Sequence, residues 1–229
     1  MAKGPTPREV ARAENLERIK RLALEQLAAT SAGELSLRAI ARELNIVSSA
    51  IYRYYPSRDE LITDLIIDAY ASLADALEVA TSNGRRGPRR RWLDACTALR
   101  QWAIEQPHRF GLVYGSAIPG YRAPADTIAP AGRVLAALCA PVAAGQAASG
   151  RELDHWAVPG RPLGSQLRDV AGQLGLVVSE RTMLGIVAAF SSIIGALTLE
   201  LNGHFVGGFE PADALFRAIV EQEADRLGL

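Results

Sequence analysis

Residues 36–61 read SLRAIARELNIVSSAIYRYYPSRDEL, which is two short apolar patterns on either side of a three-residue break. The first pattern has the i, i+3, i+4, i+7 spacing of one helix face, with Leu37, Ile40, Ala41 and Leu44. Asn45 opens the break, and asparagine adopts the left-handed backbone conformation more readily than most residues other than glycine. A second short helix is expected over residues 48–54, ended by Pro56. The segment therefore predicts two short helices joined by a tight turn.

A longer helix precedes this segment. Thr6 and Glu9 have the spacing of a capping box, and Pro7 suits the first helical position. Its apolar stripe consists of Leu16, Ile19, Ala23 and Leu27. One longer helix followed by two short ones and a tight turn predicts a three-helix helix-turn-helix unit.

The polar positions of the two short helices form the other face of this unit. A short helix enters the major groove of DNA only if its outward residues near the N-terminus are small or polar, as Ser48, Ser49 and Ala50 are. Tyr52 and Tyr54 carry hydroxyl groups suited to flanking phosphates. Arg42 and Arg53 fit either a DNA contact or an ordinary solvated helix face, and Arg53 is kept as a candidate contact. These residue types on the polar face of the two short helices predict a surface that binds DNA.

The motif string over residues 37–61 closely resembles the DNA-binding domain of the TetR/AcrR repressor family. The resemblance rests on Leu37-x-x-Ile40-Ala41-x-x-Leu44-x-Ile46 followed by Ile51-Tyr52-x-Tyr54-Tyr55-Pro56-Ser57-Arg58-Asp59-Glu60-Leu61. It implies that Ser36 and Arg58 contact phosphates and that Arg38 contacts a base or the backbone. It also implies a palindromic operator in double-stranded DNA as the partner.

Two positions depart from the family pattern. Asn45 stands where the family usually has glycine, and Val47 stands where it usually has a serine or threonine cap. A cap shifted to Ser48 would move the register of the base contacts by one residue.

The rest of the chain predicts further helices and no strands. A second capping box at Ser57–Glu60 opens a long helix over residues 57–83, and Asn83–Pro88 forms a linker. Further helices are expected at 89–105, 107–116, 125–147, 164–175, 180–202 and 211–227. We therefore predict an all-α protein with an N-terminal three-helix DNA-binding domain (1–56), a connecting helix (57–83) and a C-terminal helical bundle for ligand binding and dimerisation (84–229).

The C-terminal region carries several large aromatic residues, and the helices between them carry few charges. A mostly apolar cavity between helices is the usual form of a small-molecule site. The candidate lining residues are Trp102, Phe110, Tyr114, Tyr121, Trp156 and Phe190. Any single one of them also fits a core position.

Small residues cluster between positions 185 and 196, where they let a second helix approach closely. With the final helix, this pattern resembles the four-helix dimer interface of the family, and a two-fold protein suits two half-sites. A helix buried in a monomer is the alternative. The prediction is a homodimer.

Composition sets the remaining expectations. Net charge is zero over 229 residues, with only a mild excess of basic residues in positions 1–60 (net +2), so charge alone does not indicate nucleic acid. Cys96 and Cys139 fall in apolar helical patterns, which favours buried free thiols. The N-terminus has no apolar run, and the apolar stretch 183–201 is interrupted by glycine, serine, threonine and glutamate. We expect a cytoplasmic protein with no membrane partner.

Enzyme signatures are missing from the sequence. His108, His155 and His204 have no metal-ligand spacing, and phosphate-binding, dinucleotide-binding and nucleophile-elbow motifs do not occur. We expect no catalytic residues, no metal and no cofactor. The function predicted is a repressor released from its operator by a small, largely apolar effector. The alternative is an all-helical ligand-binding protein or enzyme whose N-terminal helices are only structural.

Overall fold

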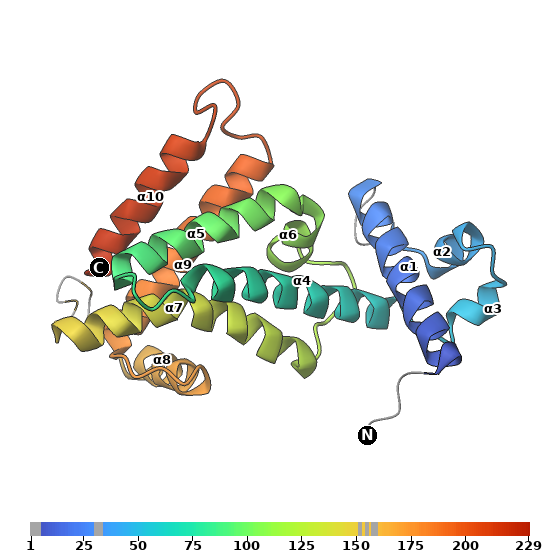
Figure 1. Ribbon diagram of the computed structural model, residues 1–229, viewed down its shortest axis with the longest axis horizontal. Coiled ribbons are helices and arrows are strands. Elements are labelled where there is room, and N and C mark those ends of the chain that lie inside the picture. The colour runs from blue at the N-terminus through green and yellow to red at the C-terminus, as the bar shows by residue number, and fades with distance from the viewer. Residues whose placement is uncertain (1–5, 30–33, 151–152, 154–155, 157–159) are drawn as a thin grey trace. The chain divides into compact units, whose positions relative to one another are not determined.

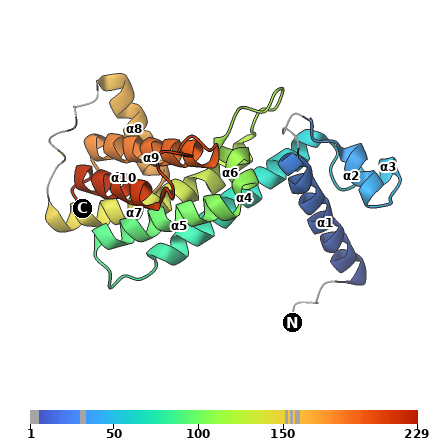
Figure 2. The same cartoon turned by 90° about the horizontal axis from the view of Figure 1, so that it is seen from above.

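The computed structural model describes residues 6–29, 34–150, 153, 156 and 160–229. Within these ranges the chain forms helices and turns and contains no strand, as predicted for an all-α fold. It divides into two compact units (Figures 1 and 2). Unit 1 comprises Met1–Ala69 and His108–Thr127, and unit 2 comprises Tyr70–Pro107 and Ile128–Leu229.

Unit 1 contains the three predicted N-terminal helices, which are α1 (Pro7–Ala29), α2 (Leu37–Glu43) and α3 (Ser48–Ile51). α2 packs against both α1 and α3. Their shared core is fully buried and includes Ile19, Ala23, Ile40, Ala41 and Ile51. The capping box of α1 forms as predicted, because the Glu9 carboxylate accepts from the amide and hydroxyl of Thr6 at 2.7 and 2.8 Å.

The first part of α4 (Arg58–Thr81) completes unit 1, to which α6 (Pro107–Tyr114) and the 3₁₀ turn η2 (Ala125–Thr127) also belong apart from the first residue of α6. Leu61 and Ile62 in the first turns of α4 are fully buried. From Tyr70 onwards α4 belongs to unit 2. One continuous helix therefore contributes to both units.

Unit 2 is a bundle of long helices: the rest of α4, α5 (Pro88–Glu105), α7 (Ile128–Ser149), α8 (Arg161–Gln173), α9 (Glu180–Leu201) and α10 (Asp213–Arg226). α5 packs against α7, α9 and α10, while α9 also packs against α8 and α10. The largest side chains of its core are fully buried, and they include Trp92, Leu99, Leu138, Met183 and Ile186.

Three predicted helix limits differ from the structure for identifiable reasons. α3 ends at Ile51 rather than near Tyr54, because the chain continues in turns from Tyr52 towards Pro56. α8 begins at Arg161 rather than 164, since Pro162 falls in the first turn, where its missing N–H costs no hydrogen bond. The helix expected from 125 begins as the separate turn η2, and α7 proper begins at Ile128.

Candidate nucleic-acid interface and effector domain

The turn between α2 and α3 fixes the relative orientation of the two helices. Asn45 has φ of 55°, the left-handed conformation expected from the sequence. Backbone hydrogen bonds from Leu44 to Ile40 O (3.0 Å) and from Ile46 to Ala41 O (3.0 Å) close the end of α2. Ser36 caps the start of α2 by accepting from the Ala39 amide at 3.3 Å. The Ser36 hydroxyl is the acceptor in this cap, so its O–H proton stays available for the predicted phosphate contact.

Val47 is the N-cap of α3, and it makes no side-chain capping bond. The cap therefore does not shift to Ser48, which is the first helical residue. Val47 itself is 71% exposed, an apolar side chain directly before the two serines. Apolar side chains in the major groove read the methyl group of thymine. Helical periodicity in the sequence places Val47 only at a cap position, which carries no sign of this exposure.

The candidate DNA-binding residues all lie on the side of α2, α3 and the start of α4 that is not part of the core. Exposed members are Arg38, Ser48, Ser49, Tyr52 and Arg53, and half-buried members are Ser36, Ala50, Tyr54 and Arg58. The opposite side of the same helices carries Leu37, Ile40, Ala41 and Ile51, all buried. None of the nine predicted residues is therefore taken up by the buried core of unit 1.

Tyr54 has partners on α1 that the sequence did not indicate. Its hydroxyl accepts a hydrogen bond from Asn15 Nδ2 at 3.1 Å, and the guanidinium carbon of Arg12 lies 5.3 Å from its ring centroid. Because Tyr54 is the acceptor towards Asn15, its own O–H proton stays available for a phosphate oxygen. Asn15 and Arg12 therefore position this tyrosine, a role visible only once α1 and the turn after α3 are brought together.

The start of α4 is capped by Ser57, whose hydroxyl accepts from the Glu60 amide at 3.2 Å. Arg58 follows with a side chain that is 30% exposed, and its Nε lies 3.9 Å from Asp59 Oδ1. A helix N-terminus with a neighbouring cation favours an anionic partner. Asp59 and Glu60 lie in the same first turn, so the phosphate contact of Arg58 stays a prediction.

A polar network in unit 1 joins α1 to α4. The Lys20 ammonium lies 3.0 Å from Asp64 Oδ2 and 2.7 Å from Asp68 Oδ2, and Tyr55 donates to Asp64 Oδ2 at 2.6 Å. Burial alone would lower the pKa of Lys20, but the hydrogen bonds that its ammonium donates to Asp68 and Asp64 outweigh burial and leave that pKa above its usual value. Burial, followed by the hydrogen bond to Asp64, raises the pKa of Tyr55. The network fixes the orientation of α4 relative to the helix-turn-helix.

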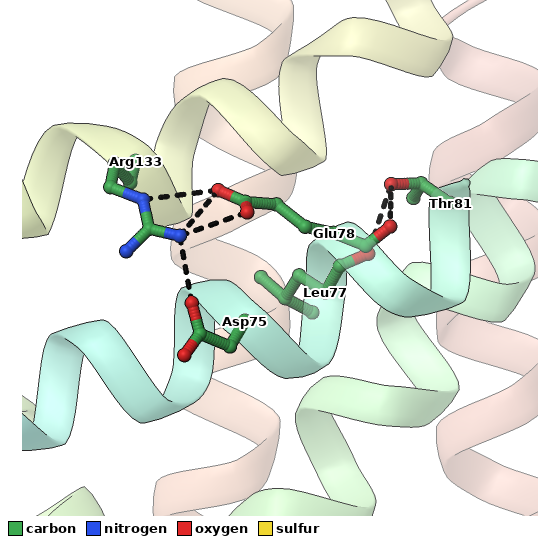
Figure 3. Close-up of polar contacts among 5 residues, drawn as sticks. All are labelled: Asp75, Leu77, Glu78, Thr81 and Arg133. Atoms are coloured by element: carbon green, nitrogen blue, oxygen red, sulfur yellow. Dashed lines mark hydrogen bonds and ion pairs between the residues drawn. The ribbon is translucent and has the colours of Figure 1, made fainter. Parts of the chain in front are cut away.

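In unit 2, the second part of α4 is held to α7 by an exposed ion-pair cluster (Figure 3). Arg133 contacts Glu78 at 2.8–3.1 Å and Asp75 at 2.8 Å. Hydrogen bonds first to Glu78 and then to Asp75 raise the pKa of Arg133. Because all three side chains are exposed, the cluster orients the helices more than it stabilises them.

The six candidate effector residues divide between the units. Phe110, Tyr114 and Tyr121 belong to unit 1, and Trp102, Trp156 and Phe190 belong to unit 2. The Phe110 and Tyr114 rings pack with centroids 5.3 Å apart, while the Tyr121 hydroxyl lies 2.9 Å from that of Thr63.

The three in unit 2 have different surroundings. Trp102 is buried on α5 and donates to Ser72 Oγ at 3.1 Å, and Trp156 is half-buried with its Nε1 3.4 Å from Arg226 O. Phe190 is half-buried at the middle of α9. The structure brings Phe110 and Tyr114 together and gives Trp102 and Trp156 separate roles in packing.

Two hollows of ligand size lie in unit 2 and were not indicated by the sequence. One of about 640 Å³ lies between the start of α5, the end of α7 and Leu229, and is lined mainly by apolar atoms. Another of about 540 Å³ lies between α5 and α10, beside Arg100 and Phe216. Small-molecule sites commonly have volumes of roughly 300–1,000 Å³. None of the six aromatic candidates lines either hollow.

Several charged residues of unit 2 that could indicate a catalytic or nucleic-acid-binding site form ion pairs with one another. Glu200 accepts two hydrogen bonds from Arg100, at 2.6 and 3.0 Å, which ties α9 to α5. In the arginine-rich start of α5, Arg86 and Arg90 pair with Asp94, and Arg89 pairs with Asp225. No group of metal-binding side chains occurs among the described residues, which do not include His155.

Cys96 and Cys139 are free and buried, as the sequence indicated. Burial raises the pKa of both thiols, that of Cys139 to about 12.

α9 combines a buried face with a low-charge exposed one. Val187, Ser191, Gly195 and Leu199 are exposed at four-residue intervals, and a Cβ added at Gly195 would meet no atom within 4 Å. α9 and the segment Ala125–Ser149 are long and apolar enough to cross a membrane by length and composition alone. Core helices of soluble proteins pass the same test, and α9 packs against α5, α8 and α10.

Comparison with known proteins matches both parts of the chain. Residues 19–65 match the family model of bacterial regulatory proteins of the tetR family, and residues 92–222 match that of the tetracyclin repressor-like C-terminal domain. The HTH-type transcriptional regulators Rv1816 of Mycobacterium tuberculosis and Mb1846 of Mycobacterium bovis are each 38% identical over 193 residues, covering 82% of this chain and 81% of theirs. The crystal structure of a protein described as regulatory, SCO4313, is 35% identical, covers 98% of this chain and 100% of its own, and superposes with a TM-score of 0.77.

Proposed function

The chain belongs to the TetR family of transcriptional regulators, and on that premise we propose that it binds a palindromic operator as a homodimer. We further propose that it represses transcription until a small, largely apolar effector releases it. The observation that carries the DNA-binding part is the division of α2 and α3 into a buried apolar side and a polar side with Ser48, Ser49 and Tyr52 exposed. Small polar side chains at the start of α3 suit contacts with base edges in the major groove.

The exposed face of α9 supports the dimer. Glycine within a helix costs about 1 kcal/mol relative to alanine, and among the described residues none lies within 4 Å of a side-chain carbon placed at Gly195. Open space is also found at Gly172 of α8, so the argument for α9 rests on the uncharged stripe of Val187, Ser191, Gly195 and Leu199, which offers apolar contact and room for a second helix. A two-fold dimer presents two recognition helices to two half-sites.

The effector part follows from the shared helix α4, which belongs to unit 1 at its start and to unit 2 beyond Tyr70. An effector acts only by binding one arrangement of the DNA-binding helices better than another. A coupling of about 1–3 kcal/mol corresponds to roughly 5–150-fold in operator affinity. The mainly apolar hollow of about 640 Å³ and the aromatic candidates are the places to test for effector contacts.

The same proposal assigns residues 1–56 to the DNA-binding domain, 57–83 to the connecting helix and 84–229 to effector binding and dimerisation. It treats the protein as cytoplasmic and without catalytic activity, in keeping with a regulator.

Selection from a random duplex library tests the proposal. The wild-type protein is expected to enrich a palindrome whose half-sites lie one helical turn or a multiple apart, and to shift it in a gel as a complex of even chain number. A panel of apolar small molecules is then titrated into that complex, with release by at least one as the expected result. Enrichment of no sequence would contradict the DNA-binding role, and release by none of the panel would count against the effector role.

A further inference from the structure

Residues His108–Thr127 belong to a different unit from the helices that precede and follow them in the chain. The segment follows α5 of unit 2 and leads into α7 of unit 2, but it packs as part of unit 1. The segment therefore links α5 and α7 through the backbone to residues that contact the start of α4.

The contact is a hydrogen bond between Tyr121 and Thr63 whose direction can be assigned. The two hydroxyl oxygens lie 2.9 Å apart, and Thr63 Oγ1 also lies 2.8 Å from the carbonyl oxygen of Asp59. A hydroxyl has one proton, and a carbonyl can only accept, so Thr63 donates to Asp59. Tyr121 must then donate to Thr63.

The backbone holds Tyr121 in place for this bond. Tyr121 N donates to Ile118 O at 3.1 Å, and Gly120 has φ of +77°, which a side chain at that position would disfavour. At the other end of the segment, Arg109 lines a hollow of about 150 Å³ with Lys20 and Asp68. The segment therefore lies beside α1 and α4 at this end, and its printed hydrogen bond to α4 is the one between Tyr121 and Thr63.

Thr63 lies five residues after Arg58, in the part of α4 that leads away from the predicted phosphate contact. We propose that Tyr121 is a positioning residue for operator binding, a role that rests on the proposed function. Its hydroxyl fixes the start of α4, and with it Arg58 and the helix-turn-helix, in the arrangement that binds the operator. The sequence predicted Tyr121 as a pocket residue, and the positioning role is a separate one that rests on its hydrogen bond to Thr63.

The test uses full-length Tyr121→Phe, Thr63→Val and the double variant, with the operator selected by the wild-type protein. Each single variant is expected to bind the operator about 3–10-fold more weakly, the usual range for losing one hydrogen bond. The double variant is expected to bind no more weakly than the weaker single one, because both remove the same bond. Affinity for a duplex of unrelated sequence is expected to stay within about twofold.

Two further variants control for a loss of packing. Thr97→Val removes a hydroxyl that makes the same bond to the carbonyl four residues earlier, to Leu93 O at 2.7 Å, but lies on α5 of unit 2, and it should bind the operator as the wild type does. Thr63→Ser keeps the acceptor and should restore binding if Thr63→Val folds poorly. Unchanged or tighter operator binding by Tyr121→Phe, or additive losses in the double variant, would overturn the positioning role. Either result would leave the proposed regulator function intact. If the wild-type protein selected no duplex, however, both the regulator function and the positioning role of Tyr121 would be contradicted.

Discussion

Tyr52 and Tyr54 are two residues apart, yet their surroundings give them different roles. Tyr54 is fixed by Asn15 and Arg12 of α1, whereas Tyr52 is 41% exposed and makes no hydrogen bond among the described residues. Its hydroxyl is therefore free to donate to a phosphate.

We expect Tyr52→Phe to weaken operator binding about 2–10-fold, and by the same factor for all operator sequences, because a phosphate contact carries no base information. Ser49→Ala, at an exposed position of α3, should instead change which bases are preferred. Fluorescence anisotropy with the operator and its single-base variants measures both, and Tyr70→Phe in unit 2 is the matched control. A change of base preference in Tyr52→Phe without loss of affinity would show the roles to be misassigned.

The two cysteines give a prediction that does not depend on DNA. With the pKa of Cys139 raised to about 12, only about one thiol in ten thousand is ionised at pH 8, and the thiolate is the reactive form. We expect the native protein to react with a disulfide reagent at least about a hundredfold more slowly than the urea-unfolded protein, in which both thiols react. Equal rates would show that these thiols are accessible in the folded state.

At the scale of elements, the network of Lys20 with Asp64 and Asp68 joins α1 to α4. Lys20 is 14% exposed and the aspartates 38–39%, which places the network between a surface and a buried ion pair. We expect Lys20→Met to lower the free energy of unfolding by about 1–2 kcal/mol, because two half-buried carboxylates lose their cationic partner and Asp64 keeps only the hydrogen bond from Tyr55. Urea denaturation measures the change. The control is Arg21→Gln on the next residue, whose pair with Glu25 spans 3.8 Å between exposed side chains and should matter by less than about 0.5 kcal/mol.

α9 carries the prediction for assembly. Gly195→Arg places a charge on the exposed low-charge face without a clash inside the chain, so the variant should fold but sediment as a monomer. Gly172→Arg on α8 is the matched control, since a side chain there also meets open space, and it should leave the dimer intact. Sedimentation velocity compares them at equal concentration. A Gly195→Arg protein that stays dimeric would move the interface away from this face.

Helices were predictable at this scale because each is marked locally. The Thr6–Glu9 box, the left-handed Asn45 and Pro107 at the start of α6 are short-range signals that the structure retains. The end of α3 and the start of α8 were misplaced because they depend on turns and a first-turn proline, which local spacing does not resolve. The polar side of α2 and α3 was predictable for the same reason, since helical periodicity separates it from the core.

For the whole molecule, contacts between residues distant in sequence could not be predicted. Asn15 lies 39 residues from Tyr54, Thr63 lies 58 from Tyr121, and Arg100 lies 100 from Glu200. Composition grouped six aromatic residues as one site, but three-dimensional packing divides them between two units. No local sequence pattern indicates that residues 108–127 pack in unit 1, because this packing depends on tertiary contacts rather than on helical periodicity.

Amide hydrogen exchange with and without the selected operator tests the central claim most directly, namely that the polar side of residues 36–58 is the surface that meets DNA. We expect operator binding to slow exchange in the turn between α2 and α3, through α3 and at the first turn of α4, and to leave α8 unchanged. Protection confined to unit 2, with residues 36–58 exchanging as in the free protein, would contradict the account.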